Sequence, residues 1–160
     1  MKQSSKKAFT MIELIFVIVV IGILSAIAIP KLAATRDDAT ITKAIATVGA
    51  VRSAVATERQ KRILKGDFTH PIETLHTSGN AFDVFNADKD SIQNRVLEYS
   101  MPDCDSLDKT TGCWKVSGSG ASSTYTYVMP TSGDEVDFNI TAGRFDCKVP
   151  TNANCKLLTQ

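Results

Sequence analysis

Hydrophobic residues form one unbroken run near the N-terminus of this 160-residue chain. From Phe9 to Ile29 the only charged residue is Glu13. A helix of this length spans about 30 Å, which is the thickness of the hydrocarbon layer of a bilayer. The run therefore predicts a transmembrane helix over residues 9–30. Pro30 lacks a backbone donor, so we expect a kink or local melting of the helix there.

After Pro30 the pattern becomes periodic. Apolar residues recur three or four positions apart, which is typical of one face of an amphipathic helix. This predicts a second helical part over residues 31–65, ended by Gly66. We expect its opposite face, rich in small residues, to suit packing between subunits. The apolar stripe is Ile41, Ile45, Val48, Val51 and Val55, and the small face is Thr42, Ala46, Thr47, Ala50, Ser53 and Ala54.

Residues 113–149 alternate between apolar and polar positions, which is typical of strands with one buried face. The turn-forming segments Gly118–Gly120, Thr131–Asp134 and Ala142–Gly143 separate four such stretches. They predict an antiparallel meander whose apolar face packs on the helix stripe. The predicted fold class is α+β, with a long N-terminal helix on an antiparallel sheet.

Between helix and strands, residues 66–112 read as connecting structure. Pro71 predicts a short helix over Ile72–His76, and a second helix is expected over Asp88–Tyr99 with Asp88 or Asp90 as its cap. The histidines, His70 and His76, lack a third ligand at a diagnostic spacing, so we interpret them as structural residues.

Glu13 is the chemically unusual residue of the N-terminal run. An acidic residue at the bilayer centre costs about 2.5–3.5 kcal/mol, so a carboxylate there is a functional candidate that needs a partner. A free amine would be such a partner, and cleavage between Ala8 and Phe9 would create one. A basic leader containing Lys2, Lys6 and Lys7 precedes this junction.

The basic leader, the junction Ala8-Phe9-Thr10-Met11-Ile12-Glu13, the apolar run and Pro30 resemble the N-terminal signal of type IV pilins and type II secretion pseudopilins. The resemblance covers about residues 6–33. It implies that a prepilin peptidase cuts before Phe9 and that the new amine is methylated. The family usually has glycine before the cut, where this chain has Ala8.

The resemblance also implies partners and a location. We expect copies of this chain and related pilin-like subunits, prepilin peptidase, an inner-membrane assembly platform and membrane lipid. The expected protein crosses the inner membrane once, with a cytoplasmic N-terminus, and enters a cell-envelope or surface filament. Its expected domains are a leader (1–8), a filament-core helix (9–30), an amphipathic helix (31–65) and a periplasmic head (66–160).

The net charge of the chain adds little to these predictions. The net charge is +1, and loss of the three leader lysines would bring it to −2. No clustered basic and aromatic motif suggests a nucleic-acid partner.

The apolar run of residues 9–29 also admits two other interpretations, a plain membrane anchor or a secretory signal cleaved after Ala28.

An even number of cysteines in an exported domain predicts disulfides, and free thiols or a metal site are the alternatives. Three pairings are possible, of which the short-range pairs Cys104–Cys113 and Cys147–Cys155 are favoured. Their spacings lack the close pair typical of structural zinc, so no metal site is predicted. The segment 147–155 is expected to be a loop, which the resemblance would place on the fibre surface.

Calcium is a secondary candidate for a cofactor. Asp134, Glu135 and Asp137 could supply oxygen ligands, but their spacing matches no recognised calcium loop. We therefore expect no cofactor.

No enzyme motif is present in the sequence. The sequence therefore predicts a structural subunit of a type IV pilus or a type II secretion pseudopilus. The alternatives are a membrane-anchored binding module that does not polymerise and a DNA-uptake pilin. The shared N-terminal segment does not separate these machines.

Overall fold

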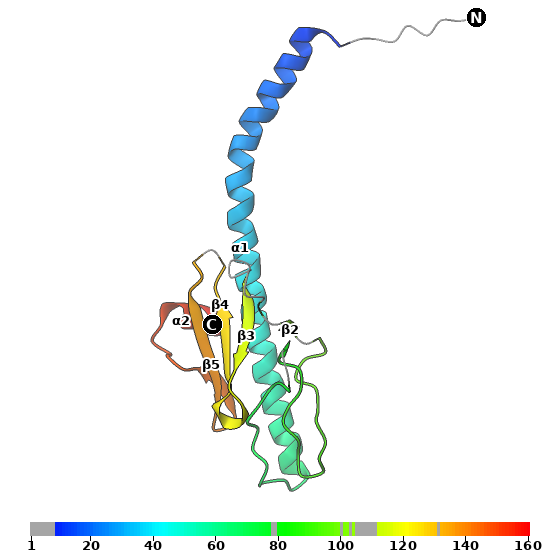
Figure 1. Cartoon of the computed structure of the whole chain (residues 1–160), viewed down its shortest axis with the longest axis vertical. Helices are drawn as coiled ribbons and strands as arrows, with labels where there is room; N and C mark the ends of the chain where they lie inside the picture. Colours follow the sequence, from blue (N-terminus) through cyan, green and yellow to red (C-terminus); the bar gives the residue numbers. More distant parts are fainter. Residues whose placement is uncertain (1–8, 78–79, 100, 103, 105–111, 131) are drawn as a thin grey trace, which may run out of the picture. The chain divides into compact units, whose positions relative to one another are not determined.

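A computed structural model describes residues 9–77, 80–99, 101, 102, 104, 112–130 and 132–160 (Figure 1). The chain divides into two units, Met1–Arg36 and Asp37–Gln160, which we describe separately and call the N-terminal unit and the head. The predicted leader lies outside the described residues. The predicted division of the chain into domains at residues 30 and 65 stays a prediction.

Helix α1 runs from Met11 to Leu64, which confirms the predicted long helix. It ends because Gly66 adopts φ +71°, a conformation that glycine tolerates best. The Gly66 N–H donates to the Ile63 carbonyl and the Asp67 N–H donates to the Arg62 carbonyl, both at 2.9 Å. These two bonds form a Schellman motif, so the predicted stop at Gly66 is confirmed.

Pro30 lies inside α1 and does not end it. The local melting expected at this position is therefore not observed. A proline removes one backbone donor, and the turns on both sides keep their own hydrogen bonds. The predicted kink stays a prediction.

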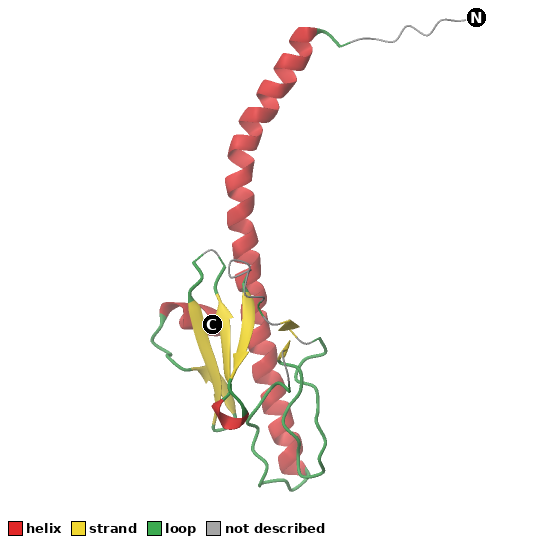
Figure 2. Cartoon of the chain, viewed as in Figure 1, coloured by secondary structure: helices red, strands yellow, loops and turns green. Residues whose placement is uncertain are grey.

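The sheet of the head is an antiparallel meander in chain order, as predicted (Figure 2). Ala142 and Gly143 join its last two strands in a two-residue turn with φ +51° and +71°. Two positive φ values mark a type I′ turn, whose twist suits a tight hairpin. The strands are β3 (Cys113–Ser117), β4 (Thr124–Val128), β5 (Glu135–Thr141) and β6 (Arg144–Cys147), with a separate short pair, β1 (Asn80–Ala81) and β2 (Met101–Pro102).

The core of the head lies between α1 and the meander. Val48, Val51 and Val55 are buried, and Ile41 and Ile45 pack against the same core. The sheet contributes a cluster of aromatic rings, which bury large apolar areas and stack edge-on or offset. The packing of helix α1 on the sheet confirms the predicted α+β fold class. The buried aromatic residues are Phe82, Phe85, Trp114, Tyr125, Tyr127, Phe138 and Phe145.

The predicted outer face of small residues is right only in part. Thr47 is buried and Ala54 packs against the core. Helical periodicity places these two positions at the margin of the apolar stripe, where the core covers them. The residues that remain exposed are Thr42, Ala46, Ala50 and Ser53.

Residues 72–76 are not helical, contrary to the prediction. Side chains from elsewhere take the backbone groups that a helix would need. The Glu73 and Thr74 N–H groups donate to the Asn86 side chain at 2.8 and 3.3 Å, and the Leu75 N–H donates to Tyr125 Oη at 2.6 Å. These bonds hold the segment extended against the sheet.

The second predicted helix, residues 88–99, is also wrong. The Asp88 carboxylate accepts from the N–H groups of Asp90 and Ile92, at 3.0 and 2.9 Å, and so folds the chain into a loop. Ser91 has φ +60°, which interrupts any helix. A bridge between Val84 and Arg95 completes the loop.

Glu58 and Arg62 form a buried ion pair on the last turns of α1. Arg62 Nε donates to Glu58 Oε1 at 3.0 Å, and both side chains are at most 5% exposed. Arg62 also donates to the carbonyls of His70, Pro71 and Asn86, and Asn94 donates to Glu58. The structure makes Arg62 the anchor of the loops that follow α1.

The carboxylates of Asp67 and Asp88 also hold the loops that follow α1 in place. Asp67 is fully buried; burial raises its pKa, but the His70 side chain and the N–H groups of Lys89, His70 and Thr69 hold that pKa below its usual range. The hydrogen bond from the Lys65 ammonium, together with the Ile92 N–H, lowers the pKa of Asp88 to about 2.

The C-terminal segment is more regular than predicted. Helix α2 spans Ala153–Thr159, so the loop predicted over residues 147–155 is wrong only for its last three residues. Asn152 caps it by accepting from the Asn154 N–H at 2.8 Å. Cys155 and Leu158 are buried in the core, and this burial holds a helix that is too short to be stable alone.

Replacing Arg62 with alanine should lower the free energy of unfolding by about 3–5 kcal/mol, because Glu58 stays buried without its partner. Fluorescence of Trp114, the single tryptophan, reports unfolding of the full chain in detergent during a denaturant titration. The control is Arg59→Ala, which changes the same residue type one turn earlier at an exposed position. Equal losses in the two variants would contradict the anchoring role of Arg62.

Acid should destabilise the head between about pH 4 and pH 2. Asp67 and Asp88 have pKa values lower in the folded chain than the value of about 3.9 of an unfolded aspartate. Their stabilisation is thus complete above pH 4 and is lost as the pH falls through the folded values. Urea titrations from pH 5 to pH 2 should give a shallower pH dependence for Asp88→Asn. The same slope in both proteins would refute this assignment.

Candidate functional site

The start of α1 brings Glu13 and Thr10 together. The Glu13 N–H donates to Thr10 Oγ1 at 3.3 Å, and the Thr10 N–H and hydroxyl donate to Glu13 Oε2 at 3.5 and 3.4 Å. Thr10 is the residue before the helix and Glu13 is its third residue, so this is a capping box. The spacing T-x-x-E before an apolar run carries this signal, but the sequence reasoning did not use it.

The other residues of the predicted processing site lie at the same end. Phe9 precedes the capping residue, and its side chain is 80% exposed. Ala8 lies outside the described residues. The capping box gives the Glu13 carboxylate local hydrogen bonds within a single chain, but it supplies no positive charge.

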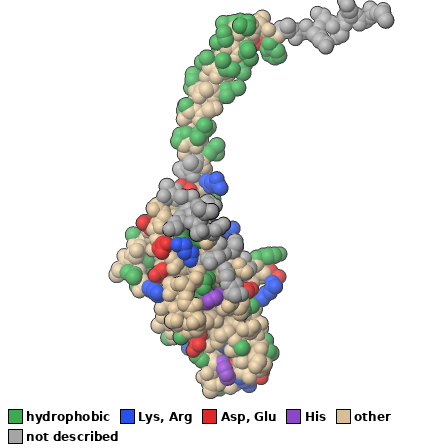
Figure 3. Space-filling view, viewed as in Figure 1, with side chains coloured by type: hydrophobic (Ala, Val, Ile, Leu, Met, Phe, Trp, Pro, Cys, Tyr) green, Lys and Arg blue, Asp and Glu red, His purple; other side chains and the backbone are tan. Residues whose placement is uncertain are grey.

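Apolar side chains are exposed along the first part of α1 (Figure 3), and Glu13 is the single charged residue between Phe9 and Ile29. This part of the helix is long and apolar enough to cross a membrane. Covering one large apolar side chain is worth about 1.5–3 kcal/mol, so lipid or other helices must surround this segment. The exposed large residues are Phe9, Met11, Ile12, Leu14, Ile15, Phe16, Val17, Ile18, Val19, Val20, Ile21, Ile23, Leu24, Ile27, Ile29 and Leu32.

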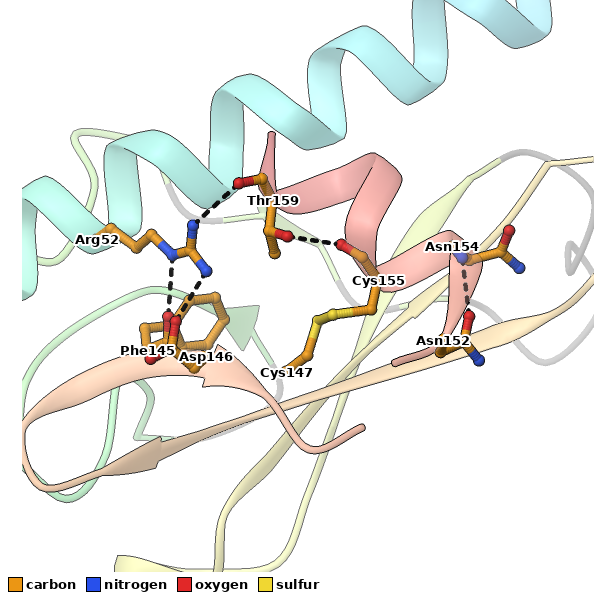
Figure 4. Close-up of a disulfide and its surroundings, with 8 residues drawn as sticks. All are labelled: Arg52, Phe145, Asp146, Cys147, Asn152, Asn154, Cys155 and Thr159. Atoms are coloured by element: carbon orange, nitrogen blue, oxygen red, sulfur yellow. Dashed lines mark hydrogen bonds and ion pairs between the residues drawn. A yellow bond between two sulfur atoms is a disulfide. The ribbon is translucent and has the colours of Figure 1, made fainter. Parts of the chain in front are cut away.

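The cysteines pair as favoured from the sequence. Cys104 bonds Cys113, the first residue of β3, and Cys147 bonds Cys155 of helix α2. The second bridge ties the end of β6 to α2, as Figure 4 shows. It closes the C-terminal segment that the resemblance places on the fibre surface.

Arg52 connects α1 with both ends of this segment (Figure 4). Its guanidinium donates to the Phe145 carbonyl at 3.1 Å, to Asp146 Oδ1 at 2.8 Å and to the Thr159 carbonyl at 3.5 Å. One side chain thus holds the helix, the last strand and the C-terminal helix together. The sequence contains no local signal for this role, because the partners lie more than 90 residues away.

The candidate calcium ligands each have another partner. Asn154 donates to Asp134 at 3.2 Å, Lys115 donates to Glu135 at 2.7 Å and Thr126 donates to Asp137 at 2.6 Å. Within the described ranges, no three His, Cys, Asp or Glu side chains are grouped as metal ligands would be.

The histidines contact loop and core residues. His70 Nδ1 lies 2.9 Å from Asp67 Oδ1, and His76 Nδ1 lies 2.9 Å from Tyr125 Oη. Burial lowers the pKa of His76 and raises the pKa of Tyr125 to about 12. The neutral imidazole and phenol therefore join the loop to β4 without a buried charge.

An apolar N-terminal helix, continued as the backbone of a small α+β head with two disulfides, defines a class of protein. Such a chain belongs to the proteins whose exposed apolar helix needs a membrane or other helices to cover it. Residues 3–29 match the family model described as the prokaryotic N-terminal methylation motif.

A relative with a known assembly confirms the family. Over 80 residues the chain is 46% identical to the type IV narrow pilus major component PilA5 of Thermus thermophilus. The match covers 48% of this chain and 68% of that protein. No solved structure matches the chain. The chain belongs to the type IV pilin family, and it is a structural pilus subunit and not an enzyme.

Removing the bridge between Cys147 and Cys155 with two serine substitutions should lower the free energy of unfolding by more than the 2–3 kcal/mol or so of loop entropy. The extra loss comes from the burial of both sulfurs in the core. Cys104→Ser with Cys113→Ser is the matched control, because its loop is one residue longer and its cysteines are half-buried. Denaturant titrations compare the two. A smaller effect at Cys147 and Cys155 would contradict the prediction.

Proposed function

We propose that this pilin enters the inner membrane with its leader in the cytoplasm, is cut between Ala8 and Phe9, and is then assembled into a type IV pilus. The lysines of the leader favour a cytoplasmic N-terminus, because positive residues stay on that side. An assembly platform in the inner membrane transfers the subunit from lipid to filament. A type II secretion pseudopilus is the alternative machine.

The observation that carries this proposal is a capped acidic residue on an otherwise apolar helix. The capping box satisfies Glu13 only partly, because Thr10 supplies hydrogen bonds but no charge. In a filament core made of such helices, water no longer solvates the carboxylate. The methylated amine of Phe9 on a neighbouring subunit then provides the missing charge.

This pairing also determines register. A buried charge is stable only where its partner lies at the right height, so wrong staggers between helices are disfavoured. The large apolar side chains around Glu13 supply the area of contact. Packing of these apolar side chains alone would tolerate several axial offsets between neighbouring helices, because the side chains differ little along the helix.

The first experiment is mass spectrometry of the N-terminal peptide from the membrane and filament fractions. A chain that starts at N-methylated Phe9 supports the proposal. A chain that starts at Met1 would indicate a plain membrane anchor. A chain that starts near Ile29 would indicate a cleaved secretory signal, and either of these would remove the filament assignment.

The substitution Glu13→Gln tests the role of the Glu13 charge in assembly most directly. Glutamine can replace glutamate in a capping box, so the helix start is preserved while the charge is lost. Leaving the neighbour's amine buried without a counter-charge costs about 3–5 kcal/mol, so we expect a more than tenfold loss of sheared filaments. Quantitative blotting of filament and membrane fractions measures this, with insertion and cleavage unchanged.

Two companion variants complete the comparison. Glu13→Ala removes both charge and cap and should assemble at least as poorly. Thr10→Ala removes half of the cap but keeps the charge, so it should assemble better than either Glu13 variant. Normal assembly of Glu13→Gln would show that Glu13 acts only as a helix cap.

A further inference from the structure

Two adjoining grooves lie beside the last turns of α1 in the head. Their volumes are about 560 and 430 Å³, and Arg59, Ile63 and Gly143 line both. The larger one lies between α1 and the turn that joins β5 to β6. We call it the arginine groove, and the described residues that line it are Arg52, Val55, Ala56, Arg59, Gln60, Ile63, Gly143, Arg144, Phe145 and Asp146.

The arginine groove carries an excess of positive charge. Asp146 is the one acidic residue among the described side chains that line it. It pairs with Arg52 at 2.8 Å and, more weakly, with Arg144 at 3.4 Å. Arg144 is 75% exposed, so most of its five donors face solvent.

Arg59 is the second available cation. It is exposed, and among the described residues it makes no hydrogen bond or ion pair. Its side chain lies along Gly143, where a Cβ would be 3.6 Å from the Arg59 Cδ. The glycine turn thus supports the arginine stem, and the guanidinium stays open at the edge of the groove. Ile63, 46% exposed, adds an apolar wall.

Carboxylates lie at the opposite end of the same strand. Strand β5 begins at Glu135, directly after Asp134, and runs seven residues to Thr141 beside the groove. At about 3.3 Å per residue, its two ends are about 20 Å apart. Asp134 and Glu135, which we call the acidic turn, are both exposed.

The acidic turn keeps free acceptor capacity. Asp134 accepts from the Asn154 amide, and Glu135 pairs with Lys115 while its side chain stays 54% exposed. A carboxylate has about four acceptor sites, so each can bind a guanidinium in addition. Arginine and carboxylate match in geometry, which favours paired hydrogen bonds.

We propose that the acidic turn of one subunit docks in the arginine groove of the next copy, with Asp134 and Glu135 facing Arg59 and Arg144. The two surfaces are different and lie at opposite ends of β5. The contact is therefore heterologous, and repeating it builds an open filament when the rotation between successive copies does not close a ring. This inference rests on the proposed pilus function and adds a contact between heads to it.

Charge reversal with rescue tests the contact in the full-length pilin. Arg59→Glu with Arg144→Glu should lower the yield of sheared filaments at least about fivefold, because two attractions become repulsions. Asp134→Arg with Glu135→Arg should do the same. The variant carrying all four changes should recover most of the yield, since the charges are complementary again. The absence of rescue would overturn the proposal.

A matched control separates this effect from a change of net charge. Lys156→Glu reverses an exposed lysine of α2 that does not line the arginine groove. It should assemble like the unchanged protein, whereas Arg59→Glu alone should be impaired. Equal yields of Lys156→Glu and Arg59→Glu would refute the role of the groove.

Disulfide trapping gives a direct readout of geometry. A chain with both Arg144→Cys and Asp134→Cys should form a ladder of covalent multimers in filaments on mild oxidation, and either single variant should give no ladder. Dimers without higher multimers would mean a closed contact and would overturn the proposal, as would unlinked subunits. Filaments of the unchanged protein are required throughout, so their absence would instead count against the proposed function.

Discussion

An exposed apolar helix is the constraint on which the rest of this structure depends. The first part of α1 is too hydrophobic to face water, and its large apolar side chains are exposed. It is therefore stable only in lipid or among other helices of its kind. In the proposed filament, Glu13 makes the second environment selective, because its carboxylate needs a positive partner that lipid does not supply.

The same helix is also the central element of the head, and this double use explains where the head is most tightly fastened. Arg52 and Arg62 project from α1 and donate to backbone carbonyls of later segments, at Phe145 and Asn86 respectively. The buried pair of Glu58 and Arg62 is costly to desolvate, but it accepts and donates enough hydrogen bonds to satisfy both charges. The loops after α1 are thus attached to the helix without regular structure of their own.

The meander positions charged side chains at its ends, in addition to contributing side chains to the core. A two-residue turn joins β5 to β6, and the exposed Asp134 and Glu135 lie at the other end of β5. Strand β5 separates an acidic end from a basic end, and the type I′ turn places Arg144 next to Arg59 across Gly143. A rigid strand between two complementary surfaces suits a protein that assembles by repetition.

Local periodicity and spacing determined much of this protein from the sequence alone. The long helix and its stop at Gly66, the four-stranded meander and the processing motif depend on neighbouring residues, and such signals can be read along the chain. Short loops also favoured the two disulfide pairings that the structure forms. The tertiary structure decided what depends on distant partners. Residues 72–76 and 88–99 are loops because Asn86, Tyr125 and Asp88 take backbone groups that a helix would have used, and the C-terminal segment becomes α2 because the core buries its apolar side. A hydrogen bond across 50 residues, such as the one from the Leu75 N–H to Tyr125, leaves no periodic trace in the sequence, which is the physical reason that these elements appeared only in the fold.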